Sequence, residues 1–333
     1  MTGLRGHERL MSRMKTTSGD VGAILMDTKG SLDLGYTVED CATVFAMSKT
    51  ACSVLECNSL QMYTSLLPYL FAPIAVLCAL PCEFFYVLGL HDRVEKILPP
   101  IFKRWLWIPY MRIMHGYEVE GLRNLPPEGE GALIVYYHGV HALDMIFVTG
   151  VIYEKLQRRV GGIAHRGLFS VPLLRSILTM YGFSADGRQK MISDLREGAL
   201  KSVAPGGTYE AMFSENYSVE FGNRCGFASV AKEAGVPIVP MFTENLRECH
   251  RQHFFGCKDF FISIYDRYKM PWLWSCGGLP VKLRTHLGKP LYCGEAESAE
   301  EFARRVREAI EGLRDANQKM DNSMVRALVE RFA

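Results

Sequence analysis

The sequence carries little net charge and lacks several signatures that would define a function directly. Its 38 Lys and Arg residues against 36 Asp and Glu residues leave a net charge of +2, without the basic excess typical of nucleic-acid binders. No G-x-S-x-G motif occurs, so a serine hydrolase with a nucleophile elbow is disfavoured. The ten cysteines follow no repeating frame and no secretory signal is recognisable, which predicts reduced thiols on the cytosolic side.

One group of residues has the ligand types of a zinc site. Cys249, His250, His253 and Cys257 lie close together in the sequence. Their spacing matches no common finger or ribbon, and a polar turn with this composition is the more common occurrence. The sequence therefore predicts no metal.

The chain has the length of one large domain or two modest ones. We expect a weakly ordered leader over residues 1–60, where apolar residues show no clear period. A membrane-embedded and interfacial segment is expected over 61–112, followed by a cytosol-facing α/β domain over 113–333.

Residues 66–90 are apolar except for Glu83, a run long enough to cross a bilayer core of about 30 Å as a helix. Three prolines favour a kinked span or a re-entrant hairpin over a straight helix, and a buried core helix is the remaining alternative. Five basic residues follow within 93–112, so the positive-inside rule places the main domain in the cytosol. Trp105, Trp107 and Tyr110 suit either a membrane interface or ordinary core packing.

Residues 132–137 form a short continuous apolar run, which is typical of a strand covered on both faces and ending at His138. Periodicity alone leaves a buried helix as the alternative. Gly139 allows a sharp turn and leaves space beside this histidine. A second histidine, His141, and a carboxylate, Asp144, follow. An imidazole with a carboxylate to fix its tautomer is a suitable general base, and a satisfied structural histidine is the competing interpretation.

Two later segments have features of an anion or oxyanion site. Arg188 falls in the first turn of a predicted helix, where it suits a phosphate, although a surface salt bridge is commoner. A strand starting at Leu200 runs into Pro205, Gly206 and Gly207, whose backbone amides can approach a ligand oxygen, or which simply mark a turn. Glu210 follows at a distance suited to a substrate hydroxyl.

The other predicted elements complete an α/β pattern. They are helices over 142–159, 171–180 and 223–234 and strands over 160–164 and 236–242, the last with two prolines that mark strand ends or an irregular edge. A capping box of Ser298 and Glu301 begins a final amphipathic helix.

In this order the segments resemble the membrane glycerolipid acyltransferases, most of all the transmembrane protein 68 branch, which is related to the type 2 diacylglycerol acyltransferases. The strings that carry the resemblance are YYHGVHALD (136–144), APGGTYEA (204–211), RCGFASVAKEAGVPIVPMFTENLRE (224–248), GGLPVKLRTHLGKP (277–290) and ALVERF (327–332). The resemblance covers roughly residues 110 to 333. It implies a domain with a central, mostly parallel sheet flanked by helices, preceded by the hydrophobic segment.

The resemblance also implies an activity: an acyl-CoA-dependent O-acyltransferase of the endoplasmic reticulum membrane that esterifies mono- or diacylglycerol to triacylglycerol. Acyl-CoA is then a co-substrate, and no other cofactor is needed. His138 is implied as the general base and Asp144 as its partner. The residues implied in substrate binding are Gly139, Arg188, Pro205, Gly206, Gly207, Glu210 and Arg224.

Alternatives remain at three points. Five residues separate His138 from Asp144 where the wider superfamily has four, so His141 competes as the partner of Asp144. The acceptor is alternatively lysophosphatidate, another lysophospholipid or a long-chain alcohol, although the P-G-G block is of the neutral-acceptor style. A non-catalytic lipid-binding protein is the third possibility. The sequence does not specify the oligomeric state, the acyl chain or the acyl donor.

Overall fold

The computed structural model describes residues 108–333, apart from 165, 171–174, 176–177, 180–181, 186, 253, 255 and 270–274. The expected leader and nearly all of the expected membrane segment lie outside the described residues, as does part of the predicted helix over 171–180. No helix in the described part combines the length and the apolar character that crossing a bilayer requires.

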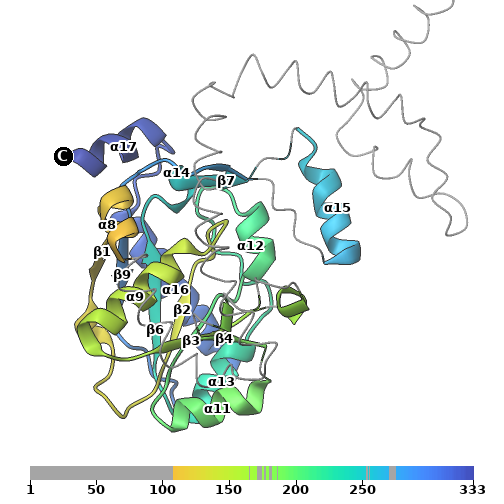
Figure 1. Ribbon diagram of the computed structural model, residues 1–333. Helices are drawn as coiled ribbons and strands as arrows, with labels where there is room; N and C mark the ends of the chain where they lie inside the picture. The colour runs from red at the N-terminus through yellow and green to blue at the C-terminus, as the bar shows by residue number, and fades with distance from the viewer. Residues whose placement is uncertain are drawn as a thin grey trace, which may run out of the picture. The chain divides into compact units, whose positions relative to one another are not determined.

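A seven-stranded sheet forms the centre of the fold (Figure 1), with the strand order β1-β9-β6-β2-β5-β3-β4. The strands β2, β3, β4, β5 and β6 run parallel, whereas β9 is antiparallel to β6 and β1 pairs with β9 in parallel. The strand bounds are β1 Glu118–Glu120, β2 Ala132–Tyr136, β3 Val160–Ile163, β4 Phe183–Ser184, β5 Leu200–Val203, β6 Ile238–Thr243 and β9 Arg284–Leu287. A separate ribbon pairs β7 His250–Gln252 with β8 Ser275–Gly277. The mostly parallel sheet predicted from the sequence is confirmed.

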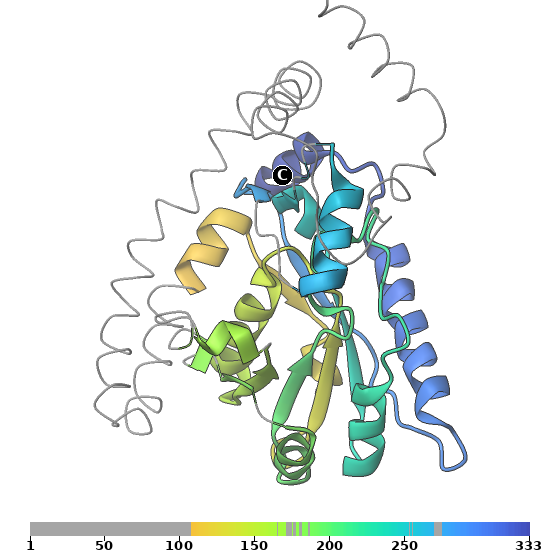
Figure 2. The same ribbon diagram turned by 90° about the vertical axis from the view of Figure 1, so that its right-hand side faces the viewer.

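Helices lie on both faces of this sheet (Figure 2). Their bounds are α8 Ile108–His115, α9 Leu143–Leu156, α11 Arg188–Arg196, α12 Gly207–Phe213, α13 Gly226–Ala234, α14 Leu246–Cys249, α15 Lys258–Tyr268, α16 Ala299–Asn317 and α17 Met324–Phe332, with short 3₁₀ turns at Leu122–Asn124 and Arg166–Ser170. The yellow-green α9 lies on one side of the strands and the blue α16 on the other. The capping box of Ser298 and Glu301 begins α16, as predicted.

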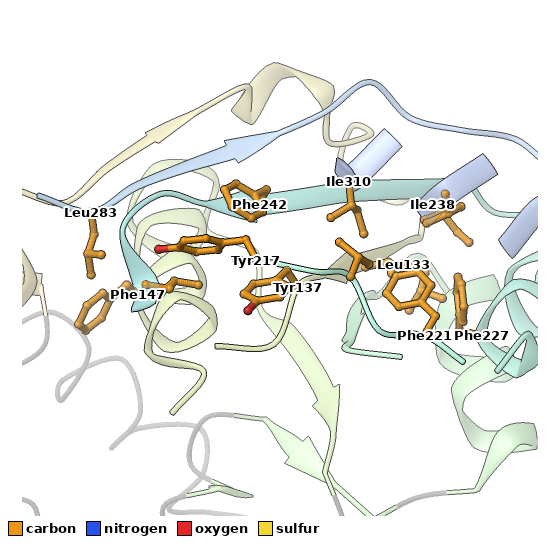
Figure 3. Close-up of a cluster of buried hydrophobic side chains, with 14 of the residues drawn as sticks. Leu133, Tyr137, Phe147, Tyr217, Phe221, Phe227, Ile238, Phe242, Leu283 and Ile310 are labelled. Atoms are coloured by element: carbon orange, nitrogen blue, oxygen red, sulfur yellow. The ribbon is translucent and has the colours of Figure 1, made fainter. Parts of the chain in front are cut away.

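The central strand β2 is buried along its whole length, as its unbroken apolar sequence predicts. Ile134 packs in a cluster with Met145 and Val148 of α9. Leu133 belongs to the other cluster, which includes Phe242 and Ile310 (Figure 3). Because both faces are covered, the strand holds the residues that follow it in a fixed position.

One proline departs from the expectation that the prolines of 236–242 mark strand ends or an edge. Pro237 does precede β6, but Pro240 lies inside it, paired with Val135 of the central strand. On the opposite side Gly288 donates to the Pro240 carbonyl at 2.8 Å. Proline has no N–H to return that bond, and the regular pairing of β6 with β9 covers only Met241 to Thr243. The proline is tolerated where β9 leaves the sheet.

Candidate functional site

Several of the predicted site residues lie at the carboxyl ends of neighbouring parallel strands. His138 follows β2 and the Pro205–Gly206–Gly207 turn follows β5, while β6 ends at Thr243, which was not predicted. Because β2 lies between β5 and β6 in the sheet, the loops after these strands meet at one edge. This edge is where open α/β sheets bind their ligands.

His138 is held at its backbone and at its ring. Its amide N donates to Glu210 Oε2 at 2.6 Å, and its Nδ1 lies 2.6 Å from the carbonyl oxygen of Gly139. That carbonyl can only accept, so Nδ1 carries the proton and Nε2 is left as the basic nitrogen. Burial lowers the pKa of His138 below its usual value, which keeps the ring neutral near pH 7. A Cβ on Gly139 would lie 3.2 Å from Leu246 Cδ1, so glycine here provides a close approach.

Asp144 lies in the first turn of α9 and is fully buried. Thr243 Oγ1 donates to Asp144 Oδ2 at 3.4 Å, while Oδ1 has no hydrogen-bond partner among the described residues. Burial raises the pKa of this carboxyl to about 7. The expected hydrogen bond with His138 is not formed here, because His138 Nδ1 is engaged by Gly139. His141 does not take its place, since His141 Nε2 is 2.6 Å from Ser275 Oγ.

Glu210 supports His138 rather than presenting a free carboxylate. Its Oε2 accepts from the His138 amide and its Oε1 from the Glu220 amide at 2.7 Å. The side chain is fully buried, and burial raises the pKa of the carboxyl to about 7. The sequence suggested a contact with a substrate hydroxyl. In this geometry both oxygens already bind backbone amides, and the carboxyl fixes the position of His138.

The glycine turn packs directly against Glu210. A Cβ on Gly206 would lie 2.4 Å from Glu210 Cδ, so no larger residue fits without displacing the carboxyl. Gly207 has a φ of +53°, and its amide donates to the Ala204 carbonyl at 3.0 Å to close the turn. The Gly207 amide is therefore not available to a substrate oxygen, contrary to the sequence expectation. The Gly206 amide has no partner among the described residues.

The two predicted phosphate-binding arginines differ in their surroundings. Arg188 begins α11 and forms an ion pair with Glu233 at 2.6 Å, with further contacts to α13. Arg224 precedes α13 and donates from Nη1 to the carbonyls of Pro205 and Gly206 at 2.7 and 2.9 Å. It is exposed, and no carboxylate among the described residues pairs with it. Arg224, beside the glycine turn, thus fits the predicted anion contact better, while Arg188 has the surface salt bridge that was its alternative.

Sequence reasoning missed Arg247, in α14. Its Nη2 donates to the Glu210 carbonyl at 3.0 Å and its Nε to the Tyr137 hydroxyl, so it joins α14 to α12 and β2. The residue stands in the string 224–248 that carries the family resemblance. No local pattern assigns it a role, because all its partners are distant in sequence. Thr243 was missed for the same reason.

The cysteines and histidines of 249–257, which have the residue types of zinc ligands, make contacts other than metal coordination. Cys249 is buried with its thiol 3.9 Å from the Leu279 carbonyl, and burial raises its pKa. The His250 ring packs edge-on against His141, with ring centroids 4.9 Å apart. Cys257 is exposed, and His253 lies outside the described residues. Across the described part of the chain, no three potential ligands converge as a metal site would require.

A neutral histidine and a buried carboxyl at the carboxyl edge of a parallel α/β sheet form an arrangement that is chemically suited to proton abstraction. Comparisons with known proteins specify the class. Residues 116–244 match the acyltransferase family model. Proteins from Homo sapiens and Bos taurus, both named "DGAT1/2-independent enzyme synthesizing storage lipids", are each 37% identical to this chain over 228 residues. The matched region is 68% of this chain, 69% of the human protein and 67% of the bovine protein.

Among solved structures, the 1-acyl-sn-glycerophosphate (LPA) acyltransferase PlsC from Thermotoga maritima superposes with a TM-score of 0.46 and 14% identity. That superposition covers 77% of this chain and 97% of the bacterial chain. On the strength of its sequence relatives, the chain belongs to the glycerolipid acyltransferase family and is an acyltransferase. This confirms the family predicted from the sequence motifs.

Proposed function

We propose that this acyltransferase uses acyl-CoA to esterify a neutral glyceride, mono- or diacylglycerol, and thereby makes triacylglycerol, with His138 as the general base. The observation that carries the proposal is the state of His138. Its proton is placed on Nδ1 by Gly139, its pKa is lowered by burial, and its backbone is fixed by Glu210. The free, basic Nε2 is the nitrogen that a hydroxyl acceptor requires.

The proposed reaction is a direct transfer. His138 Nε2 takes the proton of the acceptor hydroxyl as its oxygen attacks the thioester carbonyl carbon. The tetrahedral intermediate then expels the CoA sulfur, which takes the proton back from the imidazolium as a thiol. No covalent enzyme intermediate is required, because the thioester is already activated. The amide of Gly206, beside Glu210, has no partner among the described residues and is a backbone donor available to the oxyanion.

Asp144 supports the charged form of the base. With a pKa of about 7 it exists in both protonation states at neutral pH, and its Oδ1 is unsatisfied. We propose that the imidazolium turns its Nδ1–H from the Gly139 carbonyl to this oxygen during the reaction, which stabilises the positive charge. A buried charge requires such a partner. Arg224 is the proposed contact for a phosphate of CoA.

We further propose that the protein acts at the endoplasmic reticulum membrane with this domain facing the cytosol. The apolar run 66–90 and the basic residues after it support this orientation. In addition, Val325, Val329 and Phe332 follow helical spacing on α17 and are 71%, 60% and 74% exposed. Arg331 donates to the carbonyls that end α8, next to Ile113, which is 71% exposed. The apolar residues of α17 and α8 together suit contact with lipid.

That contact is testable by adding one tryptophan at a time to the full-length protein in vesicles containing brominated lipid. The additional emission of a Phe332→Trp variant over wild type should be quenched. The equivalent signal from Tyr292→Trp, an exposed aromatic position outside α17 and α8, should not be quenched. Equal quenching at both positions, or at neither, would refute the lipid contact of α17.

The reaction itself is tested with purified full-length wild type, His138→Ala and His141→Ala, supplied with labelled acyl-CoA. The acceptors are diacylglycerol, monoacylglycerol, lysophosphatidate and a long-chain alcohol. We expect transfer to the neutral glycerides, a loss of roughly 10²- to 10⁴-fold in His138→Ala, and retained activity in His141→Ala. Transfer to lysophosphatidate alone would refute the neutral acceptor. Equal activity in wild type and a folded His138→Ala would refute the base.

A further inference from the structure

Tyr136, the last residue of β2, has a hydroxyl with no hydrogen-bond partner among the described residues, although the residue is only 4% exposed. Three similarly buried tyrosines near the site are satisfied: Tyr117 by Thr285, Tyr137 by Ser214 and Arg247, and Tyr217 by Glu248. In the described part of the chain the buried polar side-chain atoms without a partner belong to other residues, so the small exposed area of Tyr136 includes its hydroxyl, which a ligand can reach.

The position of Tyr136 relates it to the catalytic groups. Its ring centroid is 6.2 Å from that of His138, with 32° between the ring planes. The tyrosine also lies within electrostatic reach of both Asp144 and Glu210. Burial, together with these two carboxyls, raises the pKa of the phenol well above its usual value. The hydroxyl therefore remains protonated at any physiological pH and can act as a permanent donor.

We propose that the Tyr136 hydroxyl is a further catalytic group, which donates a hydrogen bond to the carbonyl oxygen of the acyl thioester and holds the oxyanion formed there. This rests on the acyl transfer of the proposed function but not on the identity of the acceptor. The reacting carbonyl must lie within reach of the hydroxyl that His138 activates, and the ring of Tyr136 lies beside the ring of His138. The Gly207 amide is engaged in its turn, whereas the Tyr136 hydroxyl and the Gly206 amide have no partner among the described residues and can donate to that carbonyl.

The test is a Tyr136→Phe variant of the full-length protein, which removes one oxygen and keeps the ring. A matched control is Tyr265→Phe in α15, another buried tyrosine that contacts none of the site residues described above. We expect kcat of Tyr136→Phe to fall by about 10²- to 10³-fold, as for removal of one oxyanion donor. Its Tm should be unchanged, because the hydroxyl that is lost bonds to no other described residue. The control should keep its kcat.

A second measurement separates a role at the carbonyl from a general effect on binding. An S-alkyl-CoA, which lacks the carbonyl oxygen, should inhibit wild type and Tyr136→Phe with the same Ki. A kcat within twofold of wild type, a Tm lowered in parallel with activity, or a weaker Ki for this analogue would each overturn the proposal. If the wild type acylates lysophospholipid but not diacylglycerol, the proposed acceptor fails, and the same comparison on lysophospholipid still decides the role of Tyr136.

Discussion

Replacing Asp144 by Asn tests the buried carboxyl that the catalytic proposal depends on. The side chain is fully buried, accepts from Thr243 and leaves Oδ1 unpartnered. Burial raises its pKa from 3.8 to about 7. Asparagine has nearly the same shape, and its amide oxygen can still accept from Thr243, but it carries no charge. The substitution therefore removes the cost of ionising a buried group without opening a cavity.

Because folding shifts the pKa of Asp144 upward, the stability that this residue contributes falls as the pH rises. Folding raises the pKa, so the unfolded chain loses the proton first as the pH rises. The stability associated with the protonated carboxyl is complete below about pH 4, falls from there to about pH 7, and is constant above it. The difference between 3.8 and about 7 corresponds to about 4 kcal/mol of lost stability at high pH. About 2.5 kcal/mol of that loss falls between pH 5 and pH 8.

The assay is urea denaturation of the detergent-solubilised full-length protein, wild type and Asp144→Asn, at pH 5 and pH 8. We expect the variant to gain about 2.5 kcal/mol relative to wild type between the two pH values, since other titrating groups cancel in the difference. It should also lose catalytic activity, because an amide cannot stabilise the imidazolium. A relative stability that does not change with pH would refute the burial of an ionisable Asp144. Full activity of the variant would refute its role toward the base.

Two further predictions concern the glycine turn and the arginines. Gly206→Ala should lower kcat more than tenfold and reduce the Tm, because its Cβ would displace Glu210. The control Gly226→Ala, which has open space at its Cβ, should change neither kcat nor Tm. Normal activity of Gly206→Ala would show that Glu210 does not hold the base. Arg224→Gln should raise the KM for acyl-CoA about tenfold through loss of a charge-assisted contact. Arg188→Gln should change neither KM nor stability by much, since its ion pair with α13 is exposed. Equal effects of the two substitutions on KM in saturation kinetics would refute the assignment of Arg224 to the CoA phosphate.

Local sequence patterns determined the elements that carry the site. The apolar run before His138 favoured a strand buried on both faces over a buried helix, and the observed β2 has that burial throughout. The capping box of Ser298 and Glu301 likewise determined where α16 begins, because capping depends on residues within one turn. Such patterns, in order along the chain, also identified the acyltransferase family. The segment 66–90 lies outside the described residues, and its membrane location remains a prediction.

Contacts between distant segments decided what each site residue does. Glu210 binds the backbone of His138, and Arg188 pairs with Glu233, although either side chain taken from sequence alone is a plausible ligand for substrate. The sequence also gives no means to distinguish Tyr136 from Tyr137. The alternation of the strand turns their rings to opposite faces, and only the packing shows that the Tyr137 hydroxyl has partners whereas the Tyr136 hydroxyl has none among the described residues. Sequence specifies which polar groups exist, whereas hydrogen bonding and burial, which require the folded chain, decide which of them remain available for chemistry.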